Sequence, residues 1–251
     1  MVSGIYYILR TGAPWRDLPK EFGPWSPVYT RFRRWSQAKL WSKMHEQLVL
    51  EACGQLRSID CSHIKVHQDA SNAASGAAAQ AIGKTKGGSN TKLAAVVDGL
   101  GRAVGLNLVV GNRHDLRAIA ALVSTLARCW VIADRGFDSK SLRQDLAAAG
   151  ATTCIPPRKS SRIQYHFSNA LYRHRHVIEN FFARIKRFRR VGTRYEKLTE
   201  TFLGFVYIFA GDLFYRSVSC YKEAHPWVAT PNIDRLAKRG VRFTQSSTDT
   251  P

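Results

Sequence analysis

Hydrophobic and polar residues follow two different periods along this chain. Over residues 1–52 the apolar positions recur three and four apart, as they do in helices that bury one face. Glycines and prolines between residues 12 and 24 interrupt this pattern, and Ser26-Pro27 suits an N-cap followed by a first helical position. We therefore predict three helices, over residues 2–10, 26–35 and 41–52.

From residue 57 the pattern changes to short extended runs separated by turn signals. The sequence Asp98-Gly99-Leu100-Gly101 indicates a hairpin between two such runs. An Ala-, Gly- and Ser-rich stretch over 70–90 predicts a flexible loop. The predicted strands cover 58–67, 91–99, 102–110, 129–133 and 151–155, and the predicted helices cover 116–128, 139–149 and 171–190. Three strands in meander order, then helix, strand, helix, strand and helix predict an α/β fold: a ribonuclease-H-like mixed sheet flanked by helices, with a small N-terminal all-helical subdomain.

The net charge of the chain indicates what kind of partner it binds. The formal net charge is +20 and the pI is about 10.2, which points to a polyanionic partner, with nucleic acid the first candidate and an anionic membrane surface the second. We expect a soluble cytoplasmic protein, because no signal peptide is visible and the apolar run 202–214 is short and contains Asp212. The five cysteines form no CxxC pair, so we expect reduced thiols and no zinc site.

Three acidic residues occupy positions where a sheet could bring them together. Asp60 lies inside the first predicted strand, Asp134 follows the fourth, and Glu179 lies on the last helix. Sites in open sheets gather at the carboxyl ends of strands near the switch in strand order. Three carboxylates there would repel one another unless a divalent cation offset their charge, and oxygen-only ligands favour two Mg²⁺ or Mn²⁺ ions. This arrangement predicts phosphoryl transfer on nucleic acid.

The helix that carries Glu179 presents a second feature. Tyr172, Arg175, Glu179 and Lys186 fall on one edge of it, beside an apolar stripe. The alternative interpretation is an ordinary i,i+4 ion pair between Arg175 and Glu179 on a solvated face. Likewise, arginines interleaved with aromatic residues near the N-terminus suit either DNA backbone contact or a solvated basic face. The predicted DNA-binding residues are Tyr172, Arg175, Lys186, Arg187, Arg189, Arg190, Arg31, Arg33 and Arg34.

Two other motifs do not complete a site. His63 and His67 form an HxxxH pair on a predicted strand without a third ligand. Gly83-Lys84-Thr85 lacks the first glycine of a phosphate-binding loop, since that position is Ala78.

Several fragments together carry a family resemblance. They read LRTGAPWRDLPKEFGPW, IDCSHIKVHQ, GGSNTKLAAVVDGLG, VVGNRHD, VIADRGFDS and YRHRHVIENFFARIKRFRRVGTRYEK. Over residues 2–210 the chain resembles the DDE transposases of the bacterial insertion-sequence-five group. The resemblance implies a homodimer that acts on double-stranded DNA, with no small-molecule substrate. It implies metal-dependent cleavage at transposon ends and joining of the freed 3′-hydroxyls to target DNA.

The family motifs fall on specific residues. The acidic triad falls on Asp60, Asp134 and Glu179. The Y-(2)-R-(3)-E-(6)-K signature falls on Tyr172, Arg175, Glu179 and Lys186, which we call the stripe. The resemblance implies that Arg175 and Lys186 hold DNA phosphates or end bases. Asp115 and Asp138 match family positions too; we interpret Asp115 as first-turn capping and Asp138 as lying near a helix N-cap, both structural.

The two ends of the chain depart from the family pattern. The family has a further helical element upstream, so we expect an incomplete N-terminus. Residues 225–251 resemble an early TPNIDRLA-type segment of sulfatases, without the sulfatase nucleophile motif. We therefore expect a helix-turn-helix-like DNA-binding subdomain over 1–52, a DDE catalytic domain over 53–215 and a foreign tail over 216–251.

Alternative functions remain at this point. One is a catalytically inactive DNA-binding remnant or a fusion product of an inserted element. Another is a general nuclease of the ribonuclease-H type. We expect the active protein to associate with the bacterial nucleoid.

Overall fold

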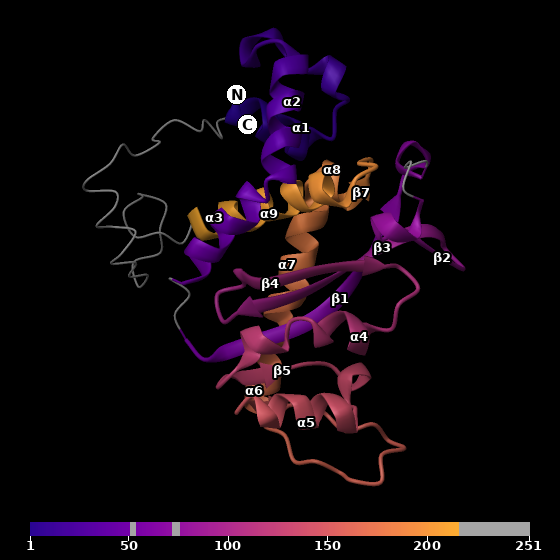
Figure 1. Cartoon of the computed structure of the whole chain (residues 1–251). Helices are drawn as coiled ribbons and strands as arrows, with labels where there is room; N and C mark the ends of the chain where they lie inside the picture. Colours follow the sequence, from indigo (N-terminus) through magenta and orange to yellow (C-terminus); the bar gives the residue numbers. More distant parts are fainter. Residues whose placement is uncertain (51–53, 72–75, 216–251) are drawn as a thin grey trace, which may run out of the picture.

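A mixed sheet with helices on both faces forms the centre of the protein (Figure 1). The computed structural model describes residues 1–50, 54–71 and 76–215. Within these ranges the sheet has seven strands in the order β2-β3-β1-β5-β6, with β4 paired to β3 and β7 paired to β1. The strands are β1 (Leu56–Val66), β2 (Gly83–Thr85), β3 (Gly88–Asp98), β4 (Ala103–Val110), β5 (Trp130–Ile132), β6 (Thr152–Cys154) and β7 (Thr193–Arg194). The predicted α/β class with a mixed sheet is confirmed.

The long strand β1 joins the two halves of the sheet. On one side it runs antiparallel to β3, with Asp60 opposite Ala95, and β3 in turn runs antiparallel to β4. On the other side β1 runs parallel to β5, which runs parallel to β6. The predicted hairpin is confirmed, since Gly101 donates its N–H to Asp98 O at 3.0 Å and has a φ of 78°.

Alternation along β3 divides the core between the two faces of the sheet. Leu93, Ala95 and Val97 face one helical layer, whereas Ala94 and Val96 face the other. The first layer contains α1 (Val2–Thr11), α2 (Trp25–Gln37), α3 (Leu40–Val49), α7 (His176–Arg187), α8 (Arg189–Gly192) and α9 (Thr199–Tyr215). The second contains α4 (Asp115–Ala120) and α5 (Lys140–Ala148).

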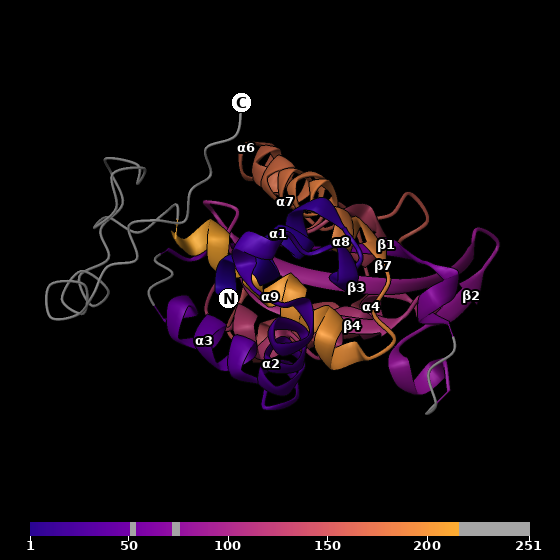
Figure 2. The same cartoon turned by 90° about the horizontal axis from the view of Figure 1, so that it is seen from above.

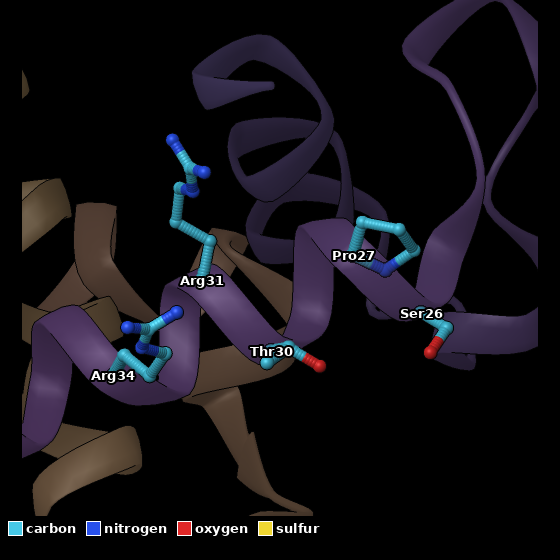
Figure 3. Close-up of a pocket in the computed structure, with 5 residues that line it drawn as sticks. All are labelled: Ser26, Pro27, Thr30, Arg31 and Arg34. Atoms are coloured by element: carbon cyan, nitrogen blue, oxygen red, sulfur yellow. The ribbon is translucent and has the colours of Figure 1, made fainter.

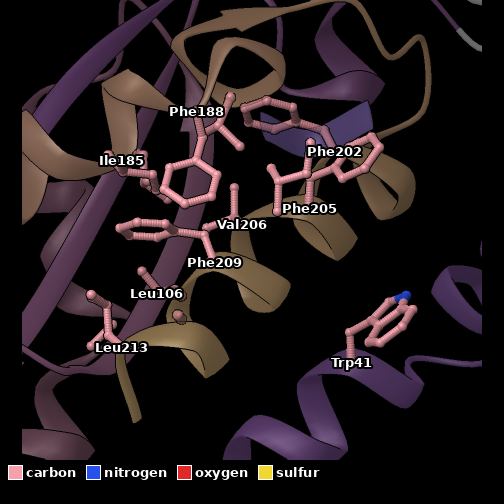
Figure 4. Close-up of a cluster of buried hydrophobic side chains, with 14 of the residues drawn as sticks. Trp41, Leu106, Ile185, Phe188, Phe202, Phe205, Val206, Phe209 and Leu213 are labelled. Atoms are coloured by element: carbon pink, nitrogen blue, oxygen red, sulfur yellow. The ribbon is translucent and has the colours of Figure 1, made fainter. Parts of the chain in front are cut away.

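The apolar helix α9 connects the N-terminal helices to the rest of the protein. Its aromatic side chains lie between α2 and α3 on one side and α7 and β4 on the other (Figure 4). The rings of Phe32 and Phe205 stack with centroids 4.4 Å apart. Figure 2 shows α2, α3 and α9 side by side, as their contacts require. The N-terminal helices therefore share one core with the sheet, and the domain boundary near residue 52 stays a prediction.

Four local predictions are wrong. Helix α2 begins at Trp25 after Pro24, so Ser26 does not act as an N-cap. The predicted helix 116–128 ends at Ala120 and continues as the 3₁₀ turn Val123–Leu126, where the Thr125 hydroxyl bonds to the Leu122 carbonyl. Residues 83–90 form β2 and the start of β3 instead of a flexible loop.

The fourth wrong prediction is a single helix over 171–190. It consists of α6 (Asn169–Tyr172), the 3₁₀ turn Arg173–Arg175, α7 and α8. The helix breaks at Phe188, whose ψ is 100°. The Phe188 ring is buried against Tyr6 and Phe209, so packing in the core overrides the helical conformation there.

Some predictions concern residues outside the described ranges. These are the foreign tail over 216–251 and the thiols of Cys53 and Cys220. No helix within the ranges described here combines the length and the apolar character needed to cross a bilayer.

Candidate functional site

Asp60 lies in β1, and Asp134 lies just beyond the end of β5, the parallel neighbour of β1. Asp60 is half-buried in β1 and accepts the backbone N–H of Cys61 at 2.7 Å. Asp134 comes two residues after the end of β5, and its Oδ1 accepts the N–H of Gly136 at 2.7 Å. Burial and repulsion from Asp134 raise the pKa of Asp60 to about 6, against the opposing effects of the Cys61 N–H and Arg175. The structure thus brings these two predicted residues together.

Arg175 connects this pair to Glu179. Its Nη1 lies 3.9 Å from Asp60 Oδ2, and its Nη2 forms an ion pair with Glu179 Oε1. Helix α7 carries Glu179 and crosses the sheet against β1 and β3, which explains how a residue late in the chain comes close to the first strand (Figure 1). The i,i+4 ion pair of the alternative interpretation is present, but Arg175 also contacts a strand carboxylate, so it is not an isolated surface pair.

A divalent ion such as Mg²⁺ needs several oxygen ligands close together. In the described residues, no group of three or more His, Cys, Asp and Glu side chains is clustered closely enough to hold a metal ion. The donor chemistry nevertheless suits Mg²⁺ or Mn²⁺, because Asp60, Asp134 and Glu179 offer only oxygen atoms and the first two already repel each other. Arg175 supplies the positive charge between Asp60 and Glu179 in this arrangement.

The other two residues of the stripe lie on either side of this ion pair. Tyr172 is half-buried, and the Arg175 guanidinium lies 6.0 Å from the centroid of its ring. Lys186 is exposed near the end of α7. The four residues thus line a surface that runs from the carboxylates to the basic end of α7.

The predicted DNA-binding arginines divide into exposed and buried residues. Arg187 and Arg189 are exposed at the end of α7 and the start of α8. Arg190 is buried: its Nε donates to Glu196 Oε1 at 2.7 Å, and both side chains are less than 10% exposed. The prediction that Arg190 contacts DNA therefore does not fit the structure, because its charge is neutralised inside the protein.

The three N-terminal arginines are exposed on α2. Ser26, Thr30 and Arg34 follow one another at intervals of four, and with Pro27 and Arg31 they line a shallow hollow (Figure 3). The Arg31 guanidinium also lies 5.9 Å from the ring centroid of Trp35. Arg33 is exposed on the same helix.

Two other acidic residues of the sequence analysis have structural partners. Asp115 lies in the first turn of α4, as predicted, and pairs with Lys92 at 2.6 Å. Asp138 precedes α5 but does not cap it; its carboxylate binds Arg143, Ser161 and the Arg158 backbone N–H instead.

One histidine of the HxxxH pair has a backbone partner. His63 Nε2 lies 3.0 Å from the Gly111 carbonyl oxygen.

Sequence reasoning missed Arg158. Its Nη2 donates to the carbonyl of Gly136 at 2.7 Å, which links the basic segment after β6 to the turn that carries Asp134. The signal that could have indicated this contact is the position of the segment. It follows the strand that is the parallel neighbour of β5, so it begins at the same edge of the sheet.

Comparison with known proteins identifies relatives for both parts of the chain. Residues 51–210 match a family model described as "Transposase DDE domain", and residues 1–45 match one described as "Putative transposase of IS4/5 family". The "Putative transposase for insertion sequence element IS6501" of Brucella ovis is 37% identical over 122 residues, which cover 47% of this chain and 92% of that protein. An uncharacterized 16.2 kDa protein of insertion element IS402 from Burkholderia cepacia is 40% identical over 88 residues, 34% of this chain and 56% of that protein. No solved structure matches the chain.

Proposed function

The chain belongs to the transposases with a DDE domain, and from this premise we propose that it cleaves DNA at insertion-sequence ends and joins the 3′-hydroxyls to target DNA. The observation that carries this proposal is a chain of interactions, in which Asp134 acts on Asp60 and Arg175 joins Asp60 to Glu179. The three carboxylates belong to β1, to the turn after β5 and to α7, which are far apart in the sequence.

The strand order supports the proposal that the fold is ribonuclease-H-like. The first three strands of the β4-β3-β1-β5-β6 path are antiparallel, and β1, β5 and β6 are parallel. Asp60 lies in the central strand and Asp134 at the carboxyl end of its parallel neighbour. This is the place in an open sheet where ligands bind.

We propose that Asp60, Asp134 and Glu179 hold two Mg²⁺ or Mn²⁺ ions. When bound, such ions activate the attacking oxygen and stabilise the leaving oxygen in an in-line displacement at a phosphodiester. The protein itself would hold the three carboxylates in fixed positions. It would also limit the access of water to Asp60, whose side chain is more buried than that of Glu179. Arg175 is placed to contact DNA phosphate beside the scissile bond.

Double-stranded DNA is the proposed partner. The exposed Lys186, Arg187 and Arg189 form one basic surface near the carboxylates, and the arginines of α2 form another. Phosphate contacts of this kind bind DNA without reading its sequence. Action as a homodimer on paired ends, and association with the nucleoid, belong to the same proposal.

The test is metal-dependent nicking of a labelled duplex that carries the ends of the element. We expect Asp60→Asn, Asp134→Asn and Glu179→Gln each to lose at least about a thousandfold in rate, because each removes a charged oxygen ligand. Asp145→Asn is the matched control, since Asp145 is an exposed carboxylate on α5 that is not one of the three proposed ligands.

Other outcomes would support other functions. Nicking by Asp60→Asn at the wild-type rate would refute the assignment. Duplex binding by the wild-type protein with no metal-dependent product would support an inactive DNA-binding remnant. Cutting of RNA–DNA hybrids without regard to transposon ends would support a general nuclease.

A further inference from the structure

We propose that residues 158–165, the loop after β6, form a DNA-backbone clamp beside Asp134 and that Asp138 is the positioning residue that holds this clamp in place. We call this segment the 158–165 loop. The inference rests on the proposed function, because it names a further part of the same DNA-binding site. Asp138 contacts the loop at the Arg158 backbone and the Ser161 hydroxyl, not at the exposed side chains of Lys159 and Arg162 that would meet DNA, so it would act through the loop.

The Asp138 carboxylate is the centre of the loop's hydrogen bonds. Its side chain is only 4% exposed, and its Oδ1 accepts a hydrogen bond from Arg143 Nε at 2.9 Å and lies 2.9 Å from Arg143 Nη2 in an ion pair. Its Oδ2 accepts the Arg158 backbone N–H and the Ser161 hydroxyl, both at 2.7 Å. These charge-assisted bonds lower the pKa of Asp138 despite its burial. One carboxylate therefore joins α5 to two positions of the loop.

The loop is also bonded to the turn that carries Asp134. Gly136 donates its N–H to Asp134 Oδ1, and its carbonyl accepts Nη2 of Arg158 at 2.7 Å. A second bond runs from Arg158 Nε to the carbonyl of Arg135 at 3.4 Å. The same turn thus orients a predicted catalytic carboxylate through one peptide group and anchors the loop through another. Movement of the loop would therefore shift the turn that orients the Asp134 carboxylate.

The loop is ordered from within as well. Gln164 Nε2 donates to the carbonyl of Ser161 at 2.7 Å, and the Arg143 guanidinium lies 4.1 Å from the centroid of the Tyr165 ring. An ordered loop loses little conformational entropy when it binds, which favours affinity.

The loop has two basic side chains that form no ion pair with a described residue. Lys159 and Arg162 are exposed, and no carboxylate in the described part of the chain forms an ion pair with either of them. Arg135 is exposed on the adjoining turn. Asp138, the acidic group closest in this network, is neutralised by Arg143. Free cations on an ordered loop beside a site for phosphoryl transfer suit the phosphates of a DNA duplex.

The first experiment measures DNA affinity without metal, so that catalysis does not enter. A fluorescently labelled mixed-sequence duplex is titrated with wild-type protein and with the double variant Lys159→Gln/Arg162→Gln, over a range of salt concentrations. Loss of two phosphate contacts should weaken binding at least about tenfold and lower the slope of log affinity against log salt by about 1.8. Both side chains are exposed, so the unfolding midpoint should not change.

The matched control is Lys84→Gln/Lys86→Gln, which removes the same charge from two exposed residues, Lys84 in β2 and Lys86 on the turn to β3. Its affinity should change less than about threefold. An equal loss in both double variants would overturn the proposal, because it would indicate an effect of net charge alone. So would unchanged binding by the loop variant. Absence of duplex binding by the wild-type protein would instead overturn the proposed function together with the clamp.

The second experiment tests Asp138 as a positioning residue. We expect Asp138→Asn to weaken duplex binding about as much as Lys159→Gln/Arg162→Gln does. The triple variant, which combines all three substitutions, should bind DNA no more weakly than Asp138→Asn or the double variant. Such non-additivity shows that Asp138 acts through Lys159 and Arg162. A purely structural Asp138 would leave the affinity of the folded Asp138→Asn protein unchanged, or would add its own loss to that of the double variant, and either result would overturn this role.

Discussion

The Arg175 guanidinium lies 3.9 Å from the Asp60 carboxylate, a contact between the turn before α7 and the middle of β1. The same guanidinium pairs with Glu179. A cation therefore stands between two of the three carboxylates to which we assign the metal ions. Arg175 neutralises part of the negative charge of Asp60 and Glu179. A metal ion that binds the same oxygen atoms must therefore compete with Arg175.

Replacement of Arg175 by Gln should therefore strengthen the binding of Mn²⁺. The ion pair is partly exposed, so its loss is expected to favour the metal by about 1 kcal/mol, or about fivefold in affinity. Electron paramagnetic resonance of free Mn²⁺ measures this without any reaction. Arg173→Gln, an exposed arginine of the same turn, is the control and should leave the affinity unchanged. Weaker Mn²⁺ binding by Arg175→Gln would contradict competition at these carboxylates.

The arginines at the end of α7 should separate into two classes. Arg190→Met breaks a buried ion pair and leaves the Glu196 carboxylate without its counter-ion, so we expect a loss of about 3 kcal/mol in the free energy of unfolding. Arg187→Gln and Arg189→Gln, at exposed positions, should keep the stability and weaken duplex binding. Urea unfolding and fluorescence anisotropy measure the two quantities. A stable Arg190→Met protein with weakened DNA binding would reverse our assignment.

Stability should fall in mild acid because of His45. This side chain is buried on α3, with Nε2 at 2.8 Å from the Ala103 carbonyl, and burial lowers its pKa from 6.5. Since the unfolded chain binds the proton more readily, the contribution of His45 is complete above pH 6.5 and is lost as the pH falls toward the native pKa, by at most about 1.4 kcal/mol per pH unit. The free energy of unfolding of His45→Gln should show less dependence on pH between 6.5 and 5. Parallel curves for the two proteins would refute this origin.

The N-terminal helices should be inseparable from the core. Phe205→Ala removes a fully buried ring from α9 that stacks on Phe32 and lies 6.0 Å from the ring of Trp15. We expect a loss of about 3–5 kcal/mol and a single unfolding transition that includes all the described helices. Calorimetry measures both. Two transitions, with only the first shifted by the mutation, would show that residues 1–49 form a separate cooperative unit.

Local patterns predicted many of the elements. The Asp98–Gly101 hairpin and the buried strand before Asp134 follow from turn chemistry and from short apolar runs, which act over a few residues. The same reasoning failed where packing overrides local preference. Phe188 breaks the helix because its ring packs in the core. Arg190 points inward because it forms a buried ion pair with Glu196.

The sequence by itself determined strands β1, β3, β4, β5 and β6, the basic character of the protein and which acidic residues are proposed for the site, but it missed β2 and β7. The tertiary structure alone decided that Arg175 lies between Asp60 and Glu179, and that Asp138 joins the basic loop to the turn of Asp134. The physical reason is the range of the interactions. Periodicity and turn chemistry act between near neighbours in the chain, whereas these contacts depend on how β1 pairs with β5 and how α7 crosses the sheet.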